Sequence, residues 1–244
     1  MKLFSRKDML SSERAKPQWF QDEYRHFHDT VTDPQFPCYL GTQAEKNGEV
    51  YYTYVEEDWS DLPRTIEAYM KVDRQSRGAP LTLAAFFKPE PSARSLNEYK
   101  NRFWEVLRFL HKQDPKPWPE DKPIDPDEYL WLFCFNGESF VVFANTPLYE
   151  KRKSRNLGNS LVIVFQPLAL FAAFMPGKSA GVKARRNIRA KIDAYDEIPI
   201  HPALGDEQGS IQHPWQHFFL PDDNEPVQGK CPFQPHRQKK LHRR

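Results

Sequence analysis

The stretch YLWLFCFNGESFVVF, residues 129–143, decides the fold class of this 244-residue chain. Two runs of aromatic and β-branched residues, 129–135 and 139–143, flank the dipeptide Asn136-Gly137. Asn and Gly tolerate the positive φ angles that a two-residue hairpin turn requires. The sequence therefore predicts a β-hairpin, with Cys134 inside its first strand as a small core residue.

Three further apolar runs predict strands on either side of this hairpin, at residues 49–55, 81–87 and 161–165. Their order along the chain lacks the regular strand–helix–strand alternation of a doubly wound fold. We therefore expect an α+β fold. It is a single domain with a mainly antiparallel sheet of about five strands, packed with amphipathic helices.

Helical periodicity predicts the helices that cover this sheet. Residues 17–31 place an apolar stripe on one helical face, and Ser95 is a capping residue for a long amphipathic helix that follows it. A basic helix is predicted over residues 180–195. We expect it to bury four side chains: Val182, Ile188, Ile192 and Tyr195.

The ends of the chain differ from its centre. We expect residues 17–233 to form the domain, residues 1–16 a flexible segment and residues 234–244 a basic, disordered tail, because a short charged terminus has nothing to bury. No run approaches the roughly 18 apolar residues of a membrane span, and the N-terminus lacks the apolar core of a secretory signal. Three cysteines cannot all pair. A cytoplasmic protein with reduced thiols and no membrane partner is expected.

Charge and motif content exclude several function classes. The net charge of +2 gives no bulk field for nucleic acid, so a nucleic-acid partner is not expected, although basic residues gather at 183–189 and in the tail. Phosphate-binding glycine loops, the serine-hydrolase elbow and paired CxxC zinc ligands are absent from the sequence. His213 and His217 are four residues apart, a spacing that in isolation more often reflects packing than a metal site.

Two tripeptides mirror each other near the two ends of the domain. Phe36-Pro37-Cys38 is repeated in reverse as Cys231-Pro232-Phe233. Together with four other segments, this pair resembles the YqcI/YcgG family, also called FPC/CPF motif-containing proteins. These segments are Trp118-Pro119, residues 152–156 (RKSRN), residues 165–167 (FQP) and residues 215–219 (WQHFF). The resemblance is nearest to the YcgG branch and covers residues 19–233.

The resemblance implies a bacterial, cytoplasmic α+β protein. Some relatives are heme-dependent oxygenases that N-hydroxylate a guanidino group, and on this basis a small nitrogenous substrate, an electron donor and a heme cofactor are expected. A thiolate ligand favours O–O cleavage at heme iron. Cys38, Cys231 and His201 are the alternative axial ligands, because each lies beside a proline in a short constrained segment.

Charged residues complete this hypothesis. Arg152 and Arg155 would pair with the heme propionates, since the guanidinium fork matches a carboxylate. A guanidinium substrate would need a carboxylate, for which Glu138 and Asp58 are equal alternatives. The competing interpretation is a non-catalytic cytoplasmic binding or stress-related protein. In that case the two proline-flanked cysteines only pack the ends of the chain together.

Overall fold

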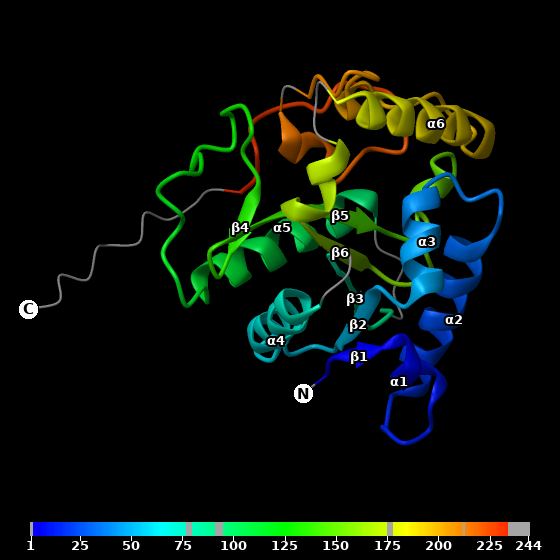
Figure 1. The fold of residues 1–244 in the computed structure, drawn as a ribbon, viewed down its shortest axis with the longest axis vertical. Helices are drawn as coiled ribbons and strands as arrows, with labels where there is room; N and C mark the ends of the chain where they lie inside the picture. Colours follow the sequence, from blue (N-terminus) through cyan, green and yellow to red (C-terminus); the bar gives the residue numbers. More distant parts are fainter. Residues whose placement is uncertain (1, 77–79, 91–94, 175–177, 212, 234–244) are drawn as a thin grey trace, which may run out of the picture.

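The computed structural model describes residues 2–76, 80–90, 95–174, 178–211 and 213–233 (Figure 1). The predicted basic tail at 234–244 lies outside these residues. The described strands form one six-stranded sheet in the order β1-β2-β3-β6-β5-β4. The strands are β1 (Phe4–Ser5), β2 (Val50–Val55), β3 (Thr82–Phe87), β4 (Phe133–Phe135), β5 (Glu138–Asn145) and β6 (Val162–Pro167). Only β2 and β3 run parallel, which confirms the α+β fold with a mainly antiparallel sheet.

Helices surround this sheet, and in the described residues none is both long and apolar enough to cross a membrane. The α-helices are α1 (Arg6–Leu10), α2 (Gln18–Thr32), α3 (Tyr39–Asn47), α4 (Leu62–Gln75), α5 (Leu96–Lys112) and α6 (Ser179–Tyr195). The 3-10 turns are η1 (Lys153–Arg155), η2 (Leu168–Phe174), η3 (Pro202–Leu204) and η4 (Pro214–His217). The parallel pair β2–β3 is connected through α4, so one strand–helix–strand unit is built into the antiparallel sheet.

The hairpin is confirmed, but its first strand is shorter than predicted. Asn136 and Gly137 have φ angles of 50° and 82°, as a tight turn requires. Only residues 133–135 of the predicted run pair with β5. Leu130 is exposed at a φ of 68°, which interrupts extended structure before the hairpin. Asp114, just beyond α5, accepts hydrogen bonds from the Asn136 amide at 3.0 and 3.1 Å and fixes the turn to that helix.

Side chains that alternate along the strands divide the core into two layers. Leu83, Ala85 and Phe87 of β3 face one layer with α4 and α5, whereas Ala84 and Phe86 face the other with α2. We call these layers the α4/α5 side and the α2/α3 side of the sheet. Figure 1 shows the two helix pairs standing apart, with the strands running between them.

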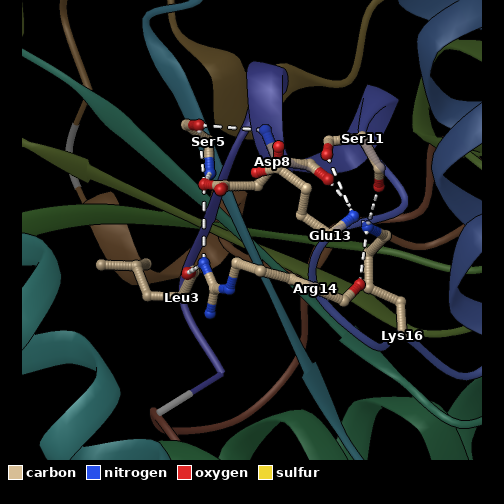
Figure 2. A network of polar contacts seen from close by, with 7 residues as sticks. All are labelled: Leu3, Ser5, Asp8, Ser11, Glu13, Arg14 and Lys16. Atoms are coloured by element: carbon tan, nitrogen blue, oxygen red, sulfur yellow. Dashed lines mark hydrogen bonds and ion pairs between the residues drawn. The ribbon is translucent and has the colours of Figure 1, made fainter.

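The N-terminal segment is part of the fold and is not a flexible extension. β1 pairs with β2, and Phe4 and Met9 are buried in the α2/α3 core. Ser5 and Asp8 form a reciprocal capping box at the start of α1. Figure 2 shows the polar contacts that hold the following turn: Arg14 donates to the Leu3 carbonyl at 2.6 Å, and Lys16 to the carbonyls of Asp8, Ser11 and Arg14. The expectation for residues 1–16 missed this order because a two-residue strand leaves almost no periodic signal.

Helix α6 has the predicted bounds, but the prediction of its buried residues is wrong. Val182, Ile188, Ile192 and Tyr195 are only half-buried, and the helix buries Gly181 and Ala184. The face of the helix that is buried thus differs from the predicted one. Two arginines contribute to this orientation, because Arg185 and Arg189 donate to the carbonyls of Glu207 and Gly205. The helix is oriented by these polar contacts as well as by its apolar stripe.

Candidate functional site

The two mirrored tripeptides lie on opposite sides of the sheet. Cys38 packs against the α2/α3 core, whereas Cys231 and Phe233 belong to the α4/α5 core. All three cysteines are free thiols, and Cys134 is buried beside Ser139 as the sequence predicted. Cys38 and Cys231 therefore do not belong to one site.

Cys231 is buried in the α4/α5 core, two residues before Phe233, whose ring lies among other aromatic rings. The Phe233 ring lies 5.4–6.1 Å from four other rings, centroid to centroid: His111, Trp118, Trp131 and Phe133. Arg108 holds the intervening proline by donating to the Pro232 carbonyl at 3.0 Å. Burial raises the pKa of Cys231 to about 12, so the thiol is neutral. This environment fits a small core residue.

Cys38 has a different environment at the start of α3. It is the residue that precedes the first turn of this helix, and it is half-buried. Burial raises the pKa of Cys38, whereas hydrogen bonds from the Gly41 and Leu40 amides and the charge of Arg155 lower it. A methyl group on Gly41 would lie 3.4 Å from Cys38 Sγ, so helix and sulfur are in close contact. The sulfur is thus surrounded by groups that favour a thiolate, opposed by burial.

Arg155, on turn η1, lies within electrostatic range of this thiol. Its guanidinium is 5.0 Å from the centre of the Phe143 ring, and Nη2 donates to the His217 carbonyl at 3.3 Å. The turn is fixed to the end of α6, because Ser154 donates from its amide and hydroxyl to Asp196 at 2.7 and 2.8 Å. Arg155 is half-buried, and this burial lowers the pKa of its guanidinium.

His217 reaches the same place from η4, a turn that crosses the edge of the sheet. The Ala144 amide donates to the Phe218 carbonyl at 2.8 Å, on the edge of β5 that the short strand β4 leaves uncovered. Trp215 and Phe218 enter the α4/α5 core. The His217 ring lies 5.9 Å from Phe143, whose side chain points to the α2/α3 side.

The imidazole of His217 is buried and neutral. Burial, and then the charge of Arg155, lower the pKa of His217 to about 3. Its Nε2 atom is buried without a hydrogen-bond partner in the described part of the chain. Buried polar atoms normally have a partner, so an unpaired nitrogen beside a cation marks a place where a ligand would add a contact. We refer to Cys38, Arg155 and His217 as the Cys38–Arg155–His217 cluster.

Arg152 and His201 lie in a separate loop-anchoring network. Arg152 is buried, and its side chain donates to Pro221, Asp223 and Asn224 at 2.9–3.0 Å. His201 accepts from the Ala203 amide at Nδ1 and donates from Nε2 to the Glu225 carbonyl, so both ring nitrogens are occupied. Burial also lowers the pKa of His201. To bind a cofactor, His201 would have to give up one of its structural hydrogen bonds. Arg152 would have to do the same or use its unpaired Nη1 atom.

The two carboxylates considered for a guanidinium substrate are exposed and lie elsewhere. Glu138 begins β5, five residues from Phe143, which is roughly 17 Å at the rise of a strand. Asp58 accepts from the Ser60 amide and hydroxyl at 2.8 and 2.7 Å, and these bonds lower its pKa. Its neighbour Trp59 packs on the α4/α5 core. Neither carboxylate is part of the cluster.

The cluster combines three different kinds of polar group. The described residues contain no group of three or more His, Cys, Asp or Glu side chains able to hold a metal. The cluster instead offers a thiol with amide hydrogen bonds, a neutral imidazole with an unpaired nitrogen and a guanidinium. The half-buried Phe143, whose ring is in contact with the Arg155 guanidinium and the His217 imidazole, gives the cluster an apolar surface.

The sequence analysis named Cys38 and Arg155 but not the cluster. His217 was considered only together with His213, and nothing in its sequence neighbourhood indicated that it approaches Arg155. The WQHFF segment was the available signal, because it was one of the segments that carried the family resemblance.

Comparisons with known proteins agree with that resemblance. The family model described as the YqcI/YcgG family matches residues 27–234. YqcI of Bacillus subtilis (strain 168) is 30% identical over 95% of this chain and 94% of its own length, and YcgG of the same organism is 33% identical over 89% and 88%. A protein of Streptomyces lavendulae named "Putative N(omega)-hydroxy-L-arginine synthase DcsA" is 32% identical over 88% of this chain and 84% of its own. No solved structure matches.

Proposed function

The chain belongs to the YqcI/YcgG family, and from this premise we propose that it is a heme-dependent oxygenase that hydroxylates a nitrogen of a small guanidino compound. The observation that carries the proposal is the Cys38–Arg155–His217 cluster, which combines a thiol, a cation and a neutral imidazole on one side of the sheet. The Streptomyces relative, which is named for N-hydroxylation of arginine and matches over most of both chains, indicates the type of reaction.

In this proposal Cys38 would hold the heme iron through its sulfur. The Leu40 and Gly41 amides would stabilise the sulfur as a thiolate, which offsets the burial that raises its pKa in the free protein. Bound heme would supply the activation of O2. The reaction balances when one oxygen atom forms the N–OH group and the other leaves as water. Two electrons from an electron donor and two protons are consumed.

The protein's own residues would restrict and orient the substrate. Phe143 would offer an apolar surface, and Arg155 would offer a positive charge beside it. The neutral His217 can donate or accept one hydrogen bond without adding a second charge.

A heme titration of two matched variants tests the proposal. Cys38→Ala and Cys231→Ala each remove one proline-flanked thiol, from opposite sides of the sheet. We expect the wild-type protein and Cys231→Ala to share one Soret band after addition of hemin, and after reduction under carbon monoxide to share the band of a thiolate complex. Cys38→Ala should lose that band while it keeps its far-ultraviolet circular dichroism.

Two outcomes would contradict the proposal. A wild-type protein that takes up no hemin would favour the competing interpretation, a non-catalytic binding protein. If both variants instead keep the wild-type spectrum, neither cysteine is the ligand.

A further inference from the structure

Arg155 is a cation without an acidic partner. In the described residues no carboxylate lies within ion-pair distance of its guanidinium, and its hydrogen bond to the His217 carbonyl, at 3.3 Å, is long. Buried charges in proteins are usually paired, because an isolated ion loses much of its solvation. Arg155 is half-buried, so a guanidinium with unused donors at this place favours an anion from outside the chain.

The charges around Arg155 do not neutralise it. Asp196 is close enough to act electrostatically, but its two oxygens accept from Ser154 and it forms no ion pair with Arg155. Arg152 lies within electrostatic range and adds a second positive charge with an unpaired Nη1 atom. Asp196, Asp222 and Asp223 offset part of this charge from a distance, but in the described residues neither arginine forms an ion pair with a carboxylate.

A further unpaired donor lies beside this charge. His217 is 7% exposed, and its Nε2 has no partner in the described residues. Its ring packs on Phe143, the same ring that contacts the Arg155 guanidinium. A carboxylate has two oxygens in a plane, which match a guanidinium fork and leave lone pairs for an imidazole N–H. A planar anion bound here would use both groups.

We propose that Arg155, assisted by His217, binds a carboxylate group, and that this carboxylate is the one of a guanidino amino acid. The identification of the guanidino substrate rests on the proposed function, whereas the carboxylate site rests on the two unpaired groups. The site would then select guanidino acids over guanidino amines of the same length.

L-Arginine and agmatine test this selection, because agmatine is arginine without its carboxylate. Binding of each to the full heme-free chain is measured by calorimetry. We expect arginine to bind at least about tenfold more tightly, as one charge-assisted bond would give. Arg155→Gln should reduce arginine to the affinity of agmatine. Lys153→Gln, on the same turn but paired with exposed Glu197, is the control and should leave the ratio unchanged.

A second variant protects against a folding artefact. His217→Gln keeps a donor of similar reach and should weaken arginine by a smaller factor than Arg155→Gln, with no change for agmatine. Equal affinities of arginine and agmatine in the wild-type protein, or a ratio that Arg155→Gln leaves intact, would overturn the substrate assignment.

The same carboxylate chemistry is also present in heme propionates, and a parallel titration separates the two sources. Hemin and its dimethyl ester are compared in wild type and Arg155→Gln. If the substrate carboxylate is the ligand, Arg155→Gln leaves the preference for hemin over the ester unchanged. If that preference disappears with Arg155, the carboxylate is a propionate, and the substrate assignment is overturned. Because arginine binding is measured without heme, failure of the heme proposal does not obscure this result.

Discussion

The Phe-Pro-Cys and Cys-Pro-Phe segments contain the same three residues and lie in unlike surroundings. Cys231 is buried in the α4/α5 core near the enclosed Phe233 ring, and Arg108 holds the Pro232 carbonyl. Cys38 starts a helix whose amides point to the sulfur, with a cation in range. A proline beside a cysteine constrains the backbone in both segments, while residues from other segments determine the polarity around each sulfur.

The largest expected difference between the two segments is in stability. Phe233→Ala should lower the free energy of unfolding by about 3–5 kcal/mol, because it removes a buried ring that contacts four others. Phe36 contacts the half-buried Tyr195, and Phe36→Ala should cost about 2 kcal/mol, because its surroundings can relax. Urea unfolding of both variants measures the difference. Equal losses of unfolding free energy in the two variants would show that Phe233 and Phe36 are packed equally tightly.

The two sides of the sheet should also respond to pH in opposite directions. His217 has a folded pKa of about 3, below its ordinary value of 6.5, so the apo protein loses stability as the pH falls from 6.5 toward 3, by up to about 1.4 kcal/mol per pH unit. Asp114, on the α4/α5 side, has its pKa raised by burial to about 6. Its contribution is therefore present below pH 3.8 and lost as the pH rises through 6.

Matched variants separate these slopes in unfolding experiments between pH 3.5 and 7. His217→Gln should flatten the acid limb. Asp114→Asn keeps an oxygen for the Asn136 amide and should remove the opposite change of unfolding free energy with pH. This change is the smaller of the two, because Asp114 is partly exposed. An acid limb that His217→Gln does not change would show that other groups dominate it.

The smallest expected difference between the two segments is in the reactivity of their thiols. In single-cysteine variants, Cys38 should react with a small alkylating reagent at least about tenfold faster than Cys231, because it is less buried and lies near Arg155. Arg155→Gln should slow Cys38 and leave Cys231 unchanged, since removal of the positive charge raises the pKa of Cys38. Gly41→Ala should slow Cys38 by contact with the sulfur, with less than about 1 kcal/mol change in stability. If Cys231 is alkylated faster than Cys38, the expected order of thiol reactivity is wrong.

Local chemistry explains which elements could be predicted from the sequence. The Asn136-Gly137 turn, the Ser95 capping box and the apolar run of β3 each depend on neighbours in sequence, and all three are present. Helix α3 was missed because it buries Thr42 and Glu45, so it has no apolar stripe. Glu45 is stabilised in the core by hydrogen bonds with His28 and Tyr52, an arrangement that only the tertiary structure provides.

The candidate site was less predictable than the fold for a geometric reason. Cys38, Arg155 and His217 come from three segments separated by 117 and 62 residues, so no spacing rule links them. They meet because Asp196 holds η1 on α6 and because η4 crosses the edge of β5. The proline neighbours of His201 make it an alternative to the two cysteines in the sequence, but they create a loop in which both ring nitrogens bond to the backbone.

The bond between the Ala144 amide and the Phe218 carbonyl also bears on self-association. β4 covers only the first part of β5, and an uncovered strand edge is a template for pairing with another chain. The turn at Pro214–His217 and the residues after it occupy that position, anchored by the Tyr149 hydroxyl on the Leu220 carbonyl at 2.6 Å. A chain that ends before Pro214 would present a bare apolar strand edge to its neighbours, so its first failure would be aggregation in solution rather than loss of a ligand.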